Sequence, residues 1–294
     1  MNLYQHISKN KRKTWILIVI YILFVTAMVW VVSEIYDYGF GLVIFAVIFS
    51  VLMSVVSYYK GDKVALASSG AKEVTKKTEQ GAYVVRMVEN LAITAGLPKP
   101  RVYIIDDPAI NAFATGRDPK HASVAVTTGA IEKLENEELE GVIAHEMSHV
   151  KNYDIRVLTL VVLLVGIITL IADLSLRGMM FGGRGRSRDN GGGALAIIGI
   201  VLIILSPIIA ELIKLSVSRK REFLADASGS LLTRFPEGLA NALEKIRKQN
   251  GKLKRANHAT AHLFFSNPFS AKKVSKLFST HPPIEERIKR LRSM

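Results

Sequence analysis

The chain has 294 residues and no cysteine, so disulfides, thiolate metal sites and cysteine nucleophiles are excluded, and a metal would have to be held by His, Asp or Glu. Hydrophobic residues make up 49% of the sequence and its mean hydropathy is +0.26, which places part of the chain in lipid. The formal net charge of +14 suits nucleic acid, an anionic membrane surface or acidic partners, and the placement of the charges must choose among them.

Four apolar runs are long enough to cross a hydrocarbon core of about 30 Å, which takes roughly 20 helical residues. They cover residues 14–33, 39–59, 156–176 and 194–217. Buried helices of a large soluble core are the alternative, but such long runs with so few charges are rare there. The first run follows the basic stretch SKNKRK, exceeds the roughly 7–15 apolar residues of a signal peptide and precedes no A-x-A-like cleavage site, so we expect an uncleaved anchor.

Lysine and arginine in the flanks of these runs predict their orientation. Several basic residues precede the first run, none lies in the connection SEIYDYG, and a basic cluster follows the fourth run, so both termini are predicted to be cytoplasmic. The Gly/Arg-rich loop between the third and fourth runs disagrees, because it holds four arginines against one acid, Asp189. The alternative for these two runs is a hairpin that does not fully cross the membrane.

Residues 60–155 and 218–294 remain for a soluble part, which this orientation places in the cytoplasm. The first segment contains a helical pattern that ends at Gly96, then PRVYIIDD and SVAVTTG, which are rich in β-branched residues and typical of short strands. A second helical pattern covers EELEGVIAHEMSHVKNYD, and the C-terminal segment is predicted to form helices with a loop around NPFS. The expected fold class is α+β, mostly helical, with four transmembrane helices.

Four regions follow from these patterns. Residues 1–59 are predicted to form an N-terminal cytoplasmic tail and the first two transmembrane helices, and residues 60–155 the first part of the soluble domain. Residues 156–217 are predicted to form the other two transmembrane helices with their Gly/Arg-rich loop, and residues 218–294 the second part of the soluble domain.

Candidate metal chemistry lies in AHEMSH, residues 144–149. Residues four apart share a helix face, so His145 and His149 can direct imidazole nitrogens at one ion, with Glu146 beside them. A catalytic zinc takes three protein ligands and leaves a position for water, whose pKa it lowers, and Glu146 is placed to accept the proton. The alternative is a helix with two incidental, partly exposed histidines, because a five-residue pattern needs support from its context.

A third ligand is offered by SRKREFLADASG, where Glu222 and Asp226 also lie four apart. Glu222 would complete a site for one zinc ion per chain, and Asp226 would hydrogen-bond a ligand histidine. Taken alone, Glu222 is better explained as a solvated acid paired with Arg219 or Lys220. However, His149 lies seven residues before the third run and Glu222 five after the fourth. Both then stand roughly 8–10 Å from the membrane boundary, which favours a zinc site near the cytoplasmic lipid surface.

With these motifs the sequence resembles the HtpX family of integral-membrane zinc metallopeptidases, which are related to the zinc-dependent CAAX prenyl proteases. The resemblance rests on AVTTGAIEKLENEELEGVIAHEMSHVKNYD, the Gly/Arg loop, SRKREFLADASG and the four apolar runs. It implies a zincin-type peptidase fold with His145, His149 and Glu222 as zinc ligands and Glu146 as general base. It also implies quality control in a bacterial plasma (inner) membrane, by cleavage of misfolded or damaged membrane proteins and unfolded polypeptides.

Two further residues match the family less closely. Asn111, in NAFATG, stands where related peptidases have an edge strand that pairs with the substrate backbone. An ordinary turn residue is an equal alternative. His281, in THPPIEERI, corresponds to a histidine implied to stabilise the oxyanion that forms when water attacks the peptide carbonyl. Its alternative is a helix-capping or turn residue before two prolines.

Competing functions stay open at this point. A prenyl-peptide protease would use the same site, but four spans cannot build the many-helix chamber of those relatives. A transporter or a non-catalytic membrane scaffold is less favoured, because the ionisable residues Asp173, Glu211 and Lys214 lie toward the ends of the runs. The basic C-terminal segments lack interleaved aromatics, so anionic lipid headgroups rather than nucleic acid are the predicted partner. Nothing in the sequence indicates the oligomeric state.

Overall fold

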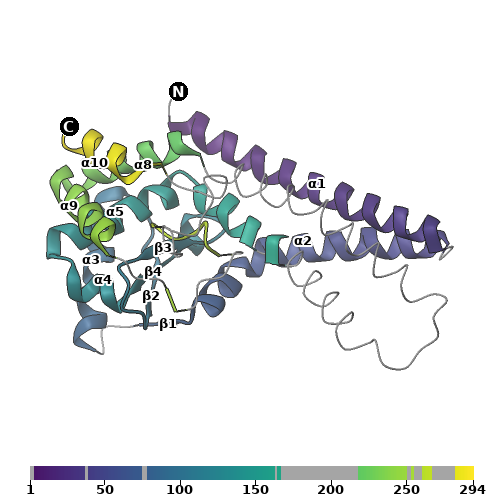
Figure 1. Cartoon of the computed structure of the whole chain (residues 1–294), viewed down its shortest axis with the longest axis horizontal. Helices are drawn as coiled ribbons and strands as arrows, with labels where there is room; N and C mark the ends of the chain where they lie inside the picture. The colour runs from purple at the N-terminus through teal and green to yellow at the C-terminus, as the bar shows by residue number, and fades with distance from the viewer. Residues whose placement is uncertain are drawn as a thin grey trace.

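The computed structural model describes residues 3–36, 39–74, 78–162, 164–166, 218–249, 253–254, 260–266 and 282–294. Two long helices extend from a compact body in which shorter helices pack on a small sheet (Figure 1). The fourth apolar run, most of the third, the Gly/Arg-rich loop and His281 lie outside the described residues.

The two long helices, α1 (Leu3–Tyr36) and α2 (Phe40–Ser69), form a hairpin (Figure 1). Its turn lies at Gly39, whose φ of +74° suits glycine because glycine has no Cβ. Small residues, among them Ser50, Ser54 and Gly61, line the buried face of α2, and small side chains allow two helices to approach closely. The polar stretch before the first apolar run, predicted to be a tail, is helical from Leu3 onward.

The hairpin exposes large apolar side chains to its surroundings. Trp15 and Leu23 on α1 are 64% and 63% exposed, and Phe40 and Ile48 on α2 are 72% and 62% exposed. Of the part of the chain that the structure describes, α2 is the helix that meets the length and composition needed to cross a membrane, and only 28% of its apolar window is buried inside the protein. A helix of a soluble core would bury most of that surface.

Four short strands form one sheet in the order β1-β2-β4-β3. The central pair is parallel and the two outer strands pair antiparallel to their neighbours. The strands are β1 (Ala71–Glu73), β2 (Arg101–Ile105), β3 (Ala112–Thr115) and β4 (Ser123–Thr127). The sequence prediction of β2 and β4 is confirmed, whereas β1 was not predicted. β3 starts directly after Asn111 and is an edge strand.

Shorter helices cover one side of this sheet (Figure 1), and the end of α2 and the helix after α5 pack on its other face. The ranges of the shorter helices are α3 (Glu79–Ala95), α4 (Thr128–Lys133), α5 (Asn136–Lys151), α8 (Arg219–Thr233), α9 (Pro236–Lys248) and α10 (Ile284–Leu291), with a short 3-10 helix, η1 (Pro119–His121), before β4. α3 ends as predicted, because Gly96 follows it with φ +67° in a left-handed cap. The described residues are thus mostly helical with a small mixed sheet, as expected from the sequence.

α5 is the central helix of the body. It contacts β3, α3, α8 and α9, and twelve of its sixteen residues are buried. Leu139, Ile143 and Met147 are completely buried in the main apolar core. The helix ends at Lys151, and Tyr153, with φ +59°, redirects the chain before a new helix begins at residue 154. The distance of His149 from the membrane boundary was estimated from the sequence on the assumption that α5 continues straight into the third apolar run. The break at Tyr153 shows that it does not.

α5 and α8 touch backbone to backbone at Gly229. A Cβ at this position would lie 2.9 Å from the main-chain nitrogen of His145 and 3.1 Å from its Cα. Any side chain on residue 229 would therefore force the two helices apart. The absence of a side chain lets α8 lie directly against the part of α5 that carries AHEMSH.

We expect Gly229→Ala to lower the free energy of unfolding by about 1–3 kcal/mol, the usual cost of overpacking a tight interior. Ser228→Ala is the matched control, because Ser228 lies on the same turn of α8 but only partly buried, and its substitution should cost less than about 0.5 kcal/mol. Urea or thermal unfolding of both variants in detergent measures the difference. Equal stability of the two variants would contradict the proposed contact.

Candidate metal centre

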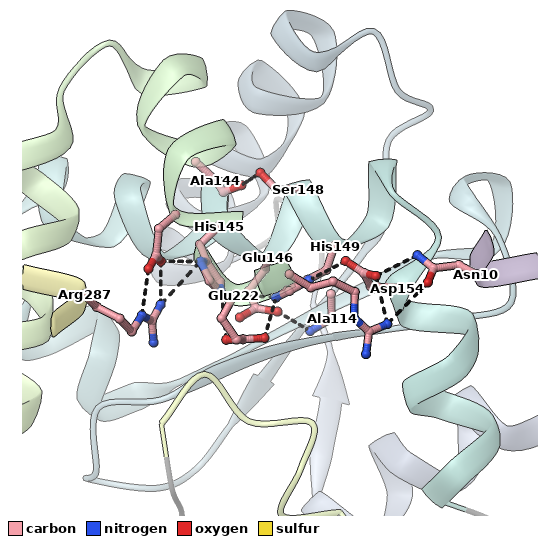
Figure 2. Close-up of polar contacts among 12 residues, drawn as sticks. Asn10, Ala114, Ala144, His145, Glu146, Ser148, His149, Asp154, Glu222 and Arg287 are labelled. Atoms are coloured by element: carbon pink, nitrogen blue, oxygen red, sulfur yellow. Dashed lines mark hydrogen bonds and ion pairs between the residues drawn. The ribbon is translucent and has the colours of Figure 1, made fainter. Parts of the chain in front are cut away.

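Three of the predicted residues converge in the space between α5 and α8 (Figure 2). His145 and His149 lie one turn apart on α5, and their Nε2 atoms are 3.1 Å from each other. The Glu222 carboxylate, near the start of α8, lies 3.8 Å from Nε2 of His145 and 3.6 Å from Nε2 of His149. The three potential ligand atoms, one from each residue, lie within 4.8 Å of one another. All three residues are buried.

Asp226 holds the far side of the His145 ring. Its Oδ1 lies 2.9 Å from Nδ1 of His145, so Nδ1–H donates to the carboxylate and Nε2 is directed at the common point. The same carboxylate accepts two hydrogen bonds from Arg287 of α10, at 2.7 and 2.9 Å. Asp226 is 2% exposed and Arg287 is 1% exposed. The predicted orienting residue is therefore itself fixed by a buried, bidentate arginine.

His149 has an equivalent partner that sequence reasoning did not single out. Its Nδ1 lies 3.0 Å from Oδ2 of Asp154, the first residue of the helix that follows α5. The other oxygen of Asp154 accepts from Arg221 at 3.1 Å and from the side-chain amide of Asn10 at 2.8 Å. Each histidine thus donates from Nδ1 to a buried carboxylate, and each carboxylate is in turn held by an arginine.

The pKa values of the two histidines move in opposite directions. Burial lowers the pKa of His145 to about 4, against the opposing effect of Asp226. Burial also acts to lower the pKa of His149, but the hydrogen bond that His149 donates to Asp154 and the negative charges of Glu222, Asp154 and Glu146 outweigh it and raise that pKa to about 9. The negative charge of these three carboxylates favours a proton on His149 and would attract other cations in the same way.

The donor set fits a metal ion. Two unprotonated Nε2 atoms at 3.1 Å would point lone pairs at each other, so the pair requires a shared proton or a cation between them. A carboxylate oxygen of Glu222 approaches the same point, and two imidazoles with one carboxylate form a three-ligand site that leaves a coordination position open. The partners at Nδ1 supply the outer support that such ligands normally have.

Glu146 lies next to the three candidate ligands and beside the sheet (Figure 2). It is 3% exposed, and its Oε2 accepts a hydrogen bond of 2.9 Å from the main-chain N–H of Ala114 on β3. The negative charge of Glu146 also contributes to the raised pKa of His149. A carboxylate held in this position can accept a proton from a molecule at the metal position.

The outer edge of β3 is covered by a short segment of the chain. The main-chain N–H of Phe265 donates to the oxygen of Ala112 at 2.8 Å. The side chain of Asn111 donates to the main-chain oxygen of Ser266 at 3.0 Å and accepts from its N–H at 3.1 Å. The Phe265 ring also stands edge-on to the His145 ring, with centroids 5.0 Å apart. Asn111 thus stands at the edge strand, where it pairs with the chain itself.

The residues that hydrogen-bond the orienting carboxylates of the candidate ligands were not predicted from the sequence. Asp154 and Arg221 stand within the quoted motifs HEMSHVKNYD and SRKREFLADASG, but nothing in their spacing distinguishes them from surface charges. Arg287 follows the proline pair by four residues and reaches Asp226 only because α10 packs on α8 and α9. His281, predicted to act on the oxyanion, lies outside the described residues.

Loss of Arg287 should destabilise the protein strongly. Arg287→Ala leaves the buried carboxylate of Asp226 without its cation, and removal of one partner of a buried pair costs about 3–5 kcal/mol. Lys289→Ala on the same helix is the matched control, because Lys289 is exposed. Thermal melting of the metal-depleted proteins should show a large decrease for the first variant and almost none for the second. A similar melting temperature for both would show that Asp226 is compensated in another way.

Comparison with known proteins gives a consistent assignment. Residues 78–294 match the family described as Peptidase family M48. The Protease HtpX homolog of Caldanaerobacter subterraneus subsp. tengcongensis is 47% identical over 99% of this chain and 98% of its own length, and that of Dictyoglomus turgidum is 45% identical over 99% and 94%. The crystal structure of S. mikatae Ste24p is similar with a TM-score of 0.49 and 18% identity, over 95% of this chain and 66% of that chain. The chain therefore belongs to peptidase family M48, among the HtpX proteases, and is a metalloprotease that hydrolyses peptide bonds.

Proposed function

We propose that this protein is a membrane-bound zinc endopeptidase that cleaves misfolded or damaged membrane proteins and unfolded polypeptides. The observation that carries the proposal is the convergence of His145, His149 and Glu222 on one buried point, with the Glu146 carboxylate beside it. The ligand set contains nitrogen and oxygen only, which suits zinc, and the chain has no cysteine to offer a softer site.

The chemistry divides between the metal and the chain. A zinc ion held by His145, His149 and Glu222 would lower the pKa of a water molecule and polarise the carbonyl of the scissile peptide. Glu146 accepts the proton of the attacking water and passes it to the leaving amine. The N–H of Ala114 orients the Glu146 carboxylate for this transfer, at 2.9 Å. His281 retains its proposed role as a donor to the oxyanion.

The substrate is proposed to bind as an extended strand along β3. The N–H of Ala114 holds the catalytic carboxylate, and the oxygen of Ala112, two residues earlier on the same edge, accepts from Phe265 instead of from β4. A peptide on this edge would take the place of Phe265 and would interact through its main chain, so that many sequences fit. Asn111, at the start of the strand, is proposed to contact the same peptide.

The membrane is proposed to supply the substrates. The α1–α2 hairpin exposes apolar side chains over its length, and Asp154, which supports His149, is the first residue of the helix that leads into the third apolar run. The metal centre would then stand close to the lipid surface, on the cytoplasmic side of a bacterial inner membrane crossed by four helices. Misfolded membrane proteins whose cytoplasmic segments unfold would be the first chains to reach it.

Zinc analysis and cleavage of an unfolded protein such as casein, in detergent, test the proposal. Wild type should contain about one zinc per chain and cut casein. Glu146→Gln should retain the zinc and lose about 10²- to 10⁴-fold in rate, because the proton acceptor is gone while the ligands remain. Glu222→Gln is the matched carboxylate control, which should lose zinc and activity together. A fully active Glu146→Gln protein would contradict the mechanism.

The prenyl-peptide protease remains the competing chemistry on the same residues. A prenylated C-terminal peptide, assayed beside its unmodified form, distinguishes the two. Cleavage of casein and of the unmodified peptide supports the general endopeptidase. Cleavage restricted to the prenylated peptide would replace the proposed substrate class and leave the roles of Glu146 and the ligands unchanged.

A further inference from the structure

Asn10 reaches the metal centre from the N-terminal helix (Figure 2). Its Nδ2 donates to Oδ1 of Asp154 at 2.8 Å and to the main-chain oxygen of Asn152 at 2.8 Å. Its Oδ1 accepts from the guanidinium of Arg221 at 3.4 Å. Asn10 is only 5% exposed. One side-chain amide therefore connects α1 with the end of α5, with the helix that follows it and with α8.

Asn10 is the polar end of the inward face of α1. Thr14, Leu17 and Tyr21 continue this face at helical spacing, and each is at most 2% exposed. Leu17 and Tyr21 pack against apolar residues of the range 157–165. The residues on either side of Asn10, by contrast, are exposed. α1 is one unbroken helix, so the amide of Asn10 and the apolar contacts of the first run belong to the same rigid element.

Asp154 links Asn10 to the ligand His149. Its Oδ2 lies 3.0 Å from Nδ1 of His149, whereas Oδ1 accepts from Asn10 and Arg221. Two donors on one oxygen fix the plane of the carboxylate and leave the other oxygen directed at the histidine. The partner of a ligand histidine sets its tautomer and ring orientation, and with them the direction of the nitrogen that binds the metal.

We propose that Asn10 is a positioning residue of the metal centre, which acts on His149 through Asp154 and ties the first apolar helix to a metal ligand. The metal part of this inference rests on the proposed function. Arg221 alone does not replace Asn10, because Asn10 also bonds the main chain of Asn152 and so fixes Asp154 relative to the end of α5. A shift of α1 against the body is transmitted to the imidazole by this route.

The competing explanation is a structural clamp that only joins α1 to the body. The two explanations differ in zinc affinity, measured by competition with a chelator on the full chain in detergent. We expect Asn10→Ala to raise the zinc dissociation constant about tenfold, at the lower end of the effect of outer partners of metal ligands. Ser8→Ala, two residues earlier and exposed, should leave it unchanged.

Asn10→Asp keeps the shape of the side chain, removes the donor and brings a second carboxylate toward Asp154, so it should weaken zinc binding at least as much as Asn10→Ala. If either Asn10 variant binds zinc as tightly as wild type, the proposal is wrong, even where its melting temperature has fallen. A decrease in melting temperature alone is the signature of the structural clamp.

A double-mutant cycle with Asp154→Ala tests the route. That variant should bind zinc about 10- to 100-fold more weakly than wild type, because His149 loses its partner. Asn10→Ala should then add no further loss, since the residue through which it acts is gone. Losses that multiply in the double variant would mean that Asn10 acts independently of Asp154, and would overturn the proposal.

The wild-type protein separates this inference from the proposed function. A wild type that binds no zinc would overturn both. A wild type that binds zinc and cleaves casein, with Asn10 variants of unchanged zinc affinity, would overturn only the role of Asn10.

Discussion

The burial of imidazole and carboxylate groups side by side between α5 and α8 is the constraint on which the rest of the structure depends. An isolated buried charge costs several kcal/mol, so each of these groups must be compensated where it lies. Asp226 is compensated by Arg287 and His145, and Asp154 by Arg221, Asn10 and His149. Because these bonds fix the Nδ1 side of each histidine, both Nε2 atoms are directed at one point by the protein itself. The metal position is thus built by the same contacts that make the buried charges tolerable.

The fold joins this buried site to the sheet and to the α1–α2 hairpin. Gly229 brings α8 against the backbone of α5, which places Glu222 and Asp226 opposite the histidines. On the side of the site that faces the sheet, the main-chain N–H of Ala114 on β3 donates a hydrogen bond to Glu146. This bond connects the edge strand proposed to bind substrate directly to the proposed general base. In Figure 1, α1 starts beside the body and runs outward with α2, and its first turns carry the amide that supports His149.

The sequence predicted those features that depend on short-range spacing. The i, i+4 histidines, the later i, i+4 pair Glu222 and Asp226, the central strands β2 and β4, and the end of α3 at Gly96 all follow from local periodicity. Asp154, Arg221, Arg287 and Asn10 were not predicted, because their roles arise from the packing of α1, α8 and α10, which no local pattern encodes. The break at Tyr153 was missed for a related reason: a non-glycine residue with positive φ is imposed by its surroundings and has no signature in the sequence.

The central claim is that His145, His149 and Glu222 together hold a zinc ion. X-ray absorption at the zinc edge of the purified, full-length protein measures the ligands directly. Two imidazole nitrogens at about 2.0–2.1 Å, with the remaining positions filled by oxygen at about 2.0–2.2 Å, is the expected coordination. A spectrum with fewer than two imidazoles, or one that is unchanged when His149 is replaced by alanine, would contradict the claim.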